Sequence, residues 1–225
     1  MRHVTPAWFR VSDIAISSLQ RPVGGPTKRT FDLIAAVIGL ALFAPLFLAC
    51  CLLVRAGVGG PVLFRHRRIG FGGREFDCLK FRTMAADAKR RFEQHLAADP
   101  DVAREWMNNH KLQEDPRVTR IGKILRRTSL DELPQLFNIL KGEMSLIGPR
   151  PIVVEEIPKY REYFTVYASG RPGLTGLWQV KGRNETTYAQ RVAFDVDYLR
   201  NWSFTRDLAI VLMTFRRVIE GRGAY

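Results

Sequence analysis

Two adjacent carboxylates, Asp131 and Glu132, are the residues of this sequence best suited to chemistry. They precede a stretch with helical spacing, and a carboxylate at a helix N-terminus stays ionised because the helix dipole favours negative charge there. An ionised Asp131 could attack phosphorus while its neighbour helps to hold Mg²⁺. Attack on a phosphate diester also needs cations that neutralise charge. The candidates for that part are Lys80, Arg82, Arg126, Arg127, Arg150 and Arg171.

The same acid pair has a purely structural interpretation. Ser129 and Glu132 fit the S-x-x-E pattern of a capping box, in which two side chains satisfy free backbone N–H groups at the start of a helix. Pro134 complicates a cap at Ser129, because a cap nearer Asp131 would leave the proline in the first helical turn, where proline is favoured. Spacing alone leaves both interpretations open.

The elements that must position these residues are short. The stretch 128–142 predicts an amphipathic helix, because its apolar residues recur at helical spacing and a glycine ends it. Residues 62–70 and 74–84 predict two strands joined by a glycine turn. Alternation along the second strand would place Lys80 and Arg82 on one face, so that two cations point together.

An apolar run at residues 33–54 predicts a membrane segment, since as one straight helix it would be about 33 Å long. Pro45 lies in the middle of the run, where a missing backbone donor is expected to break or kink the helix. Basic residues flank the run on both sides, which favours a re-entrant helix over 28–56 with both ends on one face of the membrane. A spanning helix kinked at the proline is the alternative.

Composition narrows the class of protein. The 225 residues include 35 Lys and Arg against 22 Asp and Glu, a net charge of +13, and 46% of residues are hydrophobic. That much apolar material excludes a chain that is disordered throughout. The positive charge favours polyanionic partners, namely nucleic acid, an anionic membrane surface or phosphorylated substrates.

The three cysteines, Cys50, Cys51 and Cys78, exclude a disulfide scaffold and a zinc module by their number and spacing. The expected fold class is α+β, with a re-entrant membrane helix followed by a compact, mostly helical catalytic domain with a few short strands. Further short strands or loops are expected at 144–151 and 171–180. The expected domains are a leader at 1–27, the membrane helix at 28–56 and a cytosolic interfacial domain at 57–225.

A last helix is predicted over residues 207–219, where apolar side chains form one stripe with arginines beside it. Such a stripe could lie against lipid or pack into the protein core, and the sequence does not choose between these two positions.

Four motifs in this chain are long and occur in a fixed order. They are KFRTM at 80–84, RRTSLDELPQLFNILKGEMSLIGPRP at 126–151, RPGLTGLWQVKGRN at 171–184 and FDVDYLRNWSFTRDL at 194–208. Together they resemble the bacterial sugar transferase family, the monotopic polyprenyl-phosphate phosphoglycosyl transferases. The resemblance covers nearly all of residues 27–225.

The resemblance implies a reaction. A hexose-1-phosphate passes from a UDP-sugar to undecaprenyl phosphate, UMP is released, and the enzyme depends on Mg²⁺. In this scheme Asp131 matches the acid that forms a covalent phosphosugar, and Glu132 matches the acid that holds the metal. Arg126 and Arg150 match phosphate-binding positions, with Lys80 and Arg171 as helpers, and Arg82 is a further candidate for binding phosphate or substrate from its strand position. Asp195 matches a further acid near the site.

The resemblance also implies a location at the cytoplasmic face of the bacterial inner membrane. The family's re-entrant helix bends at a Ser-Pro pair, whereas this chain has Ala44-Pro45, so the bend would depend on Pro45 alone. Nucleic acid is not an expected partner, and a homodimer is compatible with the scheme. The implied pathway is exopolysaccharide, capsule or O-antigen assembly. The C-terminal GRGAY is like that of members that use galactose or glucose.

Two other functions use the same residues. A membrane-anchored module could bind anionic lipid or nucleic acid through its basic face without catalysis, and it would tolerate Asp131→Asn. A Mg²⁺-dependent phosphohydrolase would use water as the acceptor in place of a polyprenyl phosphate.

Overall fold

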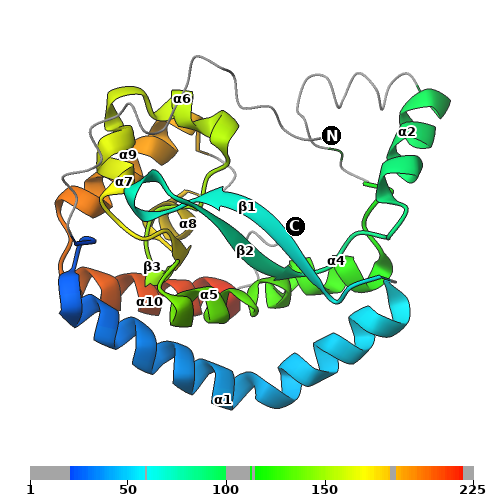
Figure 1. The fold of residues 1–225 in the computed structure, drawn as a ribbon, viewed down its shortest axis with the longest axis horizontal. Helices are drawn as coiled ribbons and strands as arrows, with labels where there is room; N and C mark the ends of the chain where they lie inside the picture. Colours follow the sequence, from blue (N-terminus) through cyan, green and yellow to red (C-terminus); the bar gives the residue numbers. More distant parts are fainter. Residues whose placement is uncertain (1–20, 59, 100–111, 113–114, 183–185, 220–225) are drawn as a thin grey trace. The chain divides into compact units, whose positions relative to one another are not determined.

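The computed structural model describes residues 21–58, 60–99, 112, 115–182 and 186–219. The leader expected at 1–27 lies mostly outside these ranges, as does the C-terminal GRGAY. Helices predominate and the strands are short, as the sequence predicts (Figure 1). The chain divides into two compact units. Of the described residues, unit 1 comprises 21–42, 65–79, 135–182 and 186–219, and unit 2 comprises 43–58, 60–64, 80–99, 112 and 115–134.

The first helix, α1 (Gly25–Gly57), contributes residues to both units. By length and composition it could cross a membrane, and little of its most apolar stretch is buried. A break at Pro45 is one of the outcomes that the sequence predicts, but the backbone is helical on both sides of this residue. The proline therefore does not end the helix, and a single missing hydrogen bond is tolerated in so long an element.

Unit 2 contains α2 (Ala88–Ala98), α4 (Arg120–Arg127) and the 3-10 turn η3 (Leu130–Glu132). Its core joins the second part of α1 to α4 through buried residues that include Val54, Phe81 and Leu125. Gly122 lies so close to the backbone of Thr83 that a Cβ atom would come within 2.1 Å of the Thr83 carbonyl oxygen. Only glycine allows this approach, which sets α4 against the segment after Phe81.

Two strand pairs are present among the described residues. The first, β1 (Leu63–Ile69) and β2 (Glu75–Phe81), is joined through the glycine-containing turn η2 (Phe71–Gly73), as the sequence predicts. The second, β3 (Ser145–Ile147) and β4 (Gly173–Thr175), lies in unit 1 and is parallel, with Ser145 opposite Gly173. Each of the two short apolar runs thus contributes one of two neighbouring strands, but residues 177–180 at the end of the second run are helical and belong to α8 (Leu177–Lys181).

Helices complete unit 1. They are α5 (Gln135–Lys141), η4 (Val154–Glu156), α6 (Ile157–Tyr160), η5 (Arg161–Tyr163), α7 (Phe164–Ala168), α8 (Leu177–Lys181), α9 (Tyr188–Arg200) and α10 (Phe204–Ile219). Helix α8 packs against α9 and α10. The predicted last helix is confirmed as α10, which begins three residues earlier than expected.

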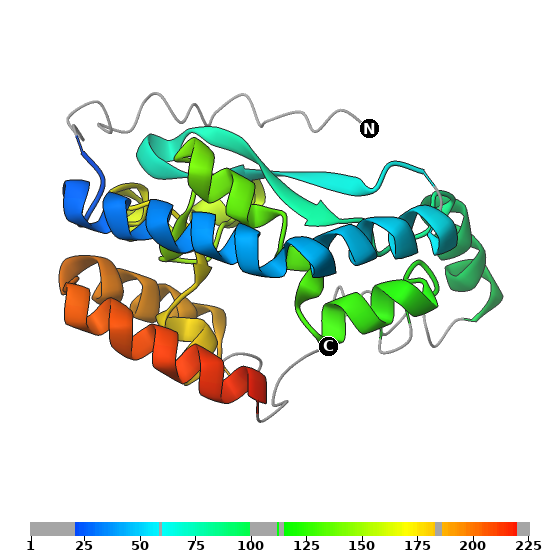
Figure 2. The same cartoon turned by 90° about the horizontal axis from the view of Figure 1, so that it is seen from below.

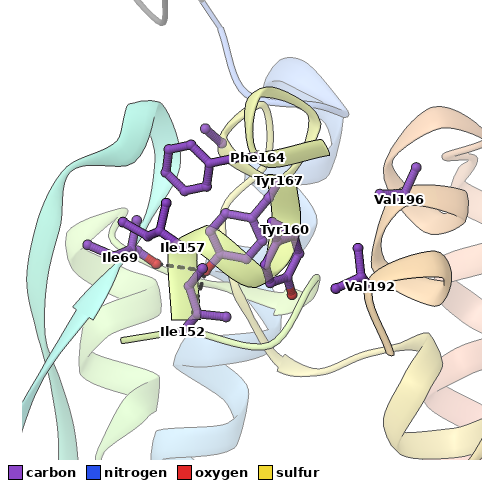
Figure 3. Close-up of a cluster of buried hydrophobic side chains, with 9 residues drawn as sticks. Ile69, Ile152, Ile157, Tyr160, Phe164, Tyr167, Val192 and Val196 are labelled. Carbon is purple, nitrogen blue, oxygen red and sulfur yellow. Dashed lines mark hydrogen bonds between the residues drawn. The ribbon is translucent and has the colours of Figure 1, made fainter. Parts of the chain in front are cut away.

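An aromatic and aliphatic cluster forms one core of unit 1 (Figure 3). Tyr167 is buried at its centre, where its hydroxyl donates to the Ile69 carbonyl (2.8 Å) and accepts from the Ile152 amide (3.2 Å). Tyr160 packs on Tyr167 with ring centres 4.9 Å apart. Because a buried hydroxyl needs partners, these bonds hold β1 and the segment after β3 in one arrangement.

A buried ion pair joins the start of α1 to α10. Lys28 Nζ donates to Asp207 Oδ2 over 2.6 Å, and both side chains are buried. The Asp207 carboxylate also accepts from the Tyr198 hydroxyl (2.6 Å) and the Trp202 indole (3.0 Å). Figure 2 shows α10 beside the first part of α1, as this network requires.

Candidate active site

The acid pair lies in a short turn and not at the start of a helix. The helix predicted over 128–142 is divided, because η3 separates α4 from α5 and α5 begins directly after Pro134. Proline has no N–H group and cannot continue the helical hydrogen bonds from the preceding turn. Ser129 has a left-handed backbone (φ 57°) and its side chain makes no capping bond, so the capping-box interpretation is wrong. Gly142 does follow α5 with a positive φ, as expected of a C-cap.

Lys80 lies against both carboxylates of the pair. Its Nζ donates to Glu132 Oε1 over 2.6 Å and lies 3.7 Å from Asp131 Oδ2. Asp131 is 8% exposed, whereas Glu132 is partly exposed. These three residues belong to unit 2, so the structure brings together two of the predicted acids and one of the predicted cations.

The environment of Asp131 has opposing effects on its pKa. Burial raises the pKa, because it penalises the charged form, and the negative charge of Glu132 adds to this effect. The positive charges of Lys80 and, to a smaller extent, Arg126 lower it, and the net direction is upward. Asp131 is therefore a carboxylate removed from water whose ionised form depends on neighbouring cations.

Arg126 is also held near the pair. Its Nε donates to Thr83 Oγ1 over 3.0 Å, a contact between the end of α4 and the segment after β2. Thr83 is a residue that the sequence analysis did not select, although it lies inside the KFRTM motif. The bond spans 43 residues, and no local pattern encodes it.

Arg82 has other contacts. Its Nε donates to the Pro61 carbonyl (2.8 Å), and its guanidinium lies 6.0 Å from the centre of the Phe64 ring. Lys80 and Arg82 are predicted to share a face of the strand, but their contacts differ: Lys80 contacts the two acids, whereas Arg82 contacts Pro61 and Phe64.

The two carboxylates have the chemistry of a magnesium site completed by a substrate. No group of three or more His, Cys, Asp or Glu residues that could hold a metal occurs within the described ranges. Mg²⁺ in phosphoryl-transfer sites is commonly held by one or two protein carboxylates together with water and substrate phosphates. Asp131 and Glu132 fit this kind of binding.

Of the other predicted site residues, Arg127 is the last residue of α4 in unit 2, and Arg150, Arg171 and Asp195 lie in unit 1. Asp195 on α9 is 1% exposed and accepts a hydrogen bond from the Tyr160 hydroxyl (2.7 Å). A further bond comes from the Arg150 backbone, and burial raises the pKa of Asp195 to about 7. The Arg150 guanidinium extends over the Trp178 ring at 5.3 Å. Asp195 thus holds the backbone from which Arg150 projects.

Arg171 is placed differently. Its Nε donates to the Gly142 carbonyl over 2.8 Å, at the end of α5. This bond connects Arg171 to the turn that follows α5.

A comparison with models of known protein families gives a match over most of the chain. The model of the family described as bacterial sugar transferase matches residues 23–221. This chain belongs to the bacterial sugar transferase family. The resemblance drawn from the four motifs is therefore confirmed.

Three relatives illustrate the range of the sugar transferase family. The exopolysaccharide production protein ExoY of Rhizobium meliloti is 52% identical over 205 residues, 91% of each chain. The undecaprenyl-phosphate galactose phosphotransferase of Salmonella typhimurium is 45% identical over 198 residues, 88% of this chain and 41% of the relative. The UDP-glucose:undecaprenyl-phosphate glucose-1-phosphate transferase of Caulobacter vibrioides is 44% identical over 207 residues, 88% of this chain and 72% of the relative. This sugar transferase is accordingly an enzyme.

Helix α10 of unit 1 has an exposed apolar surface, which agrees with the membrane attachment that the sequence predicts. Phe204, Leu208, Leu212 and Phe215 of α10 are exposed, and Leu212 has 71% of its surface free. Ile210, on the opposite side of the helix, is fully buried. The structure therefore decides a question that the sequence left open, because most of the predicted stripe faces away from the protein core. Contiguous exposed apolar side chains of this kind mark a protein or membrane contact.

Proposed function

We propose that this sugar transferase moves a hexose-1-phosphate from a UDP-sugar to undecaprenyl phosphate and releases UMP. The observation that carries the proposal is the Asp131 carboxylate, which is buried beside Lys80 and adjacent to a second acid in a member of this family. The names of the relatives supply the undecaprenyl-phosphate acceptor and, for one of them, a UDP-glucose donor. The product would enter exopolysaccharide, capsule or O-antigen assembly.

The proposed reaction has two displacements at one phosphorus atom. A carboxylate oxygen of Asp131 bonds to the β-phosphorus of the donor, and the bond from that phosphorus to the bridging oxygen breaks. UMP leaves with the bonding electron pair. An oxygen of undecaprenyl phosphate then attacks the same phosphorus, the bond to Asp131 breaks, and the carboxylate is restored.

Lys80 and Arg126 have roles that follow from their contacts. Both cations favour the ionised form of Asp131, which is the form that attacks. Asp131 loses its negative charge when the covalent phosphosugar forms, so Lys80 can then neutralise phosphoryl oxygens. Arg82, Arg150 and Arg171 remain candidates for binding substrate phosphates, and Asp195 for positioning Arg150.

Mg²⁺ is the proposed cofactor. Glu132, with Asp131, would hold the ion, which would neutralise charge on the diphosphate of the donor. Glu132 is the better of the two for this role because its side chain is more exposed than that of Asp131.

The proposed location is the cytoplasmic face of the bacterial inner membrane. Helix α1 supplies the anchor, and the exposed face of α10 would lie at the level of the lipid headgroups, where the phosphate of a polyprenyl lipid also lies.

The test is UMP release by purified enzyme in nanodiscs, with UDP-glucose or UDP-galactose, Mg²⁺, and undecaprenyl phosphate present or absent. We expect lipid-dependent release that is lost in Asp131→Asn and on addition of EDTA, with recovery when Mg²⁺ is restored. Asp87→Asn is the matched control, because Asp87 is a carboxylate of unit 2 that pairs only with exposed arginines of α2 among the contacts described.

Two results would contradict the proposal. Sustained turnover without lipid would indicate a phosphohydrolase, and unchanged turnover in Asp131→Asn would remove Asp131 as the nucleophile.

A further inference from the structure

Two arginines of unit 1 lie on the same tryptophan. The guanidinium carbons of Arg191 and Arg150 are 4.4 Å and 5.3 Å from the centre of the Trp178 ring. Arg191 comes from α9, Trp178 from α8, and Arg150 from the segment after β3. Stacking on an aromatic face fixes a guanidinium plane and leaves its N–H groups directed outward from the ring edge.

These side chains have donors without acceptors. Arg150 Nε, Arg191 Nε and Trp178 Nε1 are all buried and have no hydrogen-bond partner among the described residues. Trp178 is itself only 6% exposed. Guanidinium and indole groups can donate but cannot accept, so none of the three can satisfy another. Buried donors are nearly always paired in folded proteins, and three unpaired donors around one ring indicate a missing acceptor.

The charges nearby are also unbalanced. Arg68 of β1 adds a third cation, and burial, followed by repulsion from Arg150, lowers its pKa. Its carboxylate partner is Glu156, at 3.8 Å. Asp195 attracts both Arg150 and Arg191, but it is fully buried and already accepts from Tyr160 and from the backbone of Arg150. An anion from outside the chain would supply both the charge and the acceptors.

We propose that Arg191 and Trp178, together with Arg150, form a phosphoryl-binding site in unit 1, with Arg191 as a second arginine that grips the anion. The ligand class is a phosphate ester or diphosphate, which matches the planar fork of an arginine in geometry and charge. Arg191 and Trp178 carry this inference, since neither belongs to the residues selected from the sequence. The inference rests on the proposed function, in which two substrates carry such groups: the nucleotide sugar and the polyprenyl phosphate.

The experiment measures equilibrium binding, so it is independent of whether Asp131 is the nucleophile. Arg191→Gln, Arg191→Lys and Trp178→Phe would be titrated in nanodiscs with UDP, with undecaprenyl phosphate and with uridine, which lacks a phosphate. Arg200→Gln is the matched control, because Arg200 lies on the same helix and is exposed. Urea unfolding of each variant reports any general loss of structure.

For Arg191→Gln we expect the Kd of one phosphorylated probe to rise at least about 10-fold, as for loss of a charge-assisted hydrogen bond. Binding of uridine and the unfolding midpoint should stay unchanged. Arg191→Lys should recover part of the affinity, since it keeps the charge but loses the fork. Trp178→Phe should weaken binding less than Arg191→Gln does, because it removes one donor and keeps the stacking face.

The probe that responds identifies the source of the phosphate. A change with UDP assigns the site to the donor, and a change with undecaprenyl phosphate assigns it to the acceptor. Unchanged affinity for both probes would overturn the proposal. A lower unfolding midpoint with equal losses for UDP and uridine would also overturn it, because it would show that Arg191 only supports the fold.

Discussion

Replacing Lys80 by methionine tests whether this cation keeps Asp131 ionised. Methionine retains most of the apolar stem of lysine and removes the charge. In the structure the lost contacts are those of Nζ with Glu132 at 2.6 Å and with Asp131 at 3.7 Å. Because Lys80 is the largest influence that lowers the pKa of Asp131, its removal should raise that pKa further.

The size of the effect follows from the distance. Two unit charges about 4 Å apart attract by about 4 kcal/mol at an effective dielectric constant of about 20 and by about 1 kcal/mol in water. Lys80 keeps 28% of its side chain exposed, so water screens part of the attraction to Asp131. We therefore expect the Lys80→Met substitution to remove about 1–2 kcal/mol of the free energy that stabilises ionised Asp131. This corresponds to roughly a 5- to 30-fold loss of kcat/KM where ionisation of Asp131 limits the rate.

The assay is the pH profile of kcat/KM for UMP release. Protonated Asp131 cannot attack, so activity falls on the acidic side of the profile, and a higher pKa moves that fall to higher pH. The loss in Lys80→Met should be largest at low pH and should shrink as the pH rises. Lys123→Met is the matched control, because Lys123 is an exposed residue of α4 in the same unit.

A different pattern would refute the reasoning. If Lys80 only binds substrate phosphate, kcat/KM should fall by one factor at every pH and the acidic limb should stay in place. That result would mean that Lys80 does not stabilise the ionised form of Asp131 in the free enzyme.

Two predictions concern the stability of unit 1, measured by urea unfolding in detergent through tryptophan fluorescence. Lys28→Met leaves Asp207 buried without its cation and should cost about 3–5 kcal/mol, whereas the double variant with Asp207→Asn should be less destabilised than the sum of the two single variants. A loss below about 1 kcal/mol would show that the pair is screened by water. Asn138→Leu removes bonds to the Leu79 amide (2.9 Å), the Asp77 carbonyl (2.7 Å) and Glu143 (2.6 Å), and should cost about 2–4 kcal/mol. Wild-type stability in this variant would mean that water replaces the lost partners.

Much of this protein can be predicted from local sequence. The uncharged run at 33–54 determines a long apolar helix, since no other backbone structure satisfies so many polar groups within an apolar segment. The glycine turn between 62–70 and 74–84 determines a strand pair, and the spacing after Asp207 determines α10. The ordered motifs determine the family. Each of these features depends on residues close together in the chain or on a pattern read directly from it.

Tertiary structure decided the features that depend on distant partners. Ser129 and Glu132 satisfy the capping-box pattern, yet the backbone at Ser129 is left-handed and the acids turn toward Lys80, which lies 52 residues before Glu132. The exposed face of α10 could not be read from periodicity, because a stripe has the same spacing whether it meets protein or lipid. Arg191 lies outside the four motifs, so the local sequence does not distinguish it from the other arginines. Its contact with Trp178 arises only when α8 and α9 pack, since contacts between side chains far apart in sequence are set by packing and by the need to pair or expose every polar group.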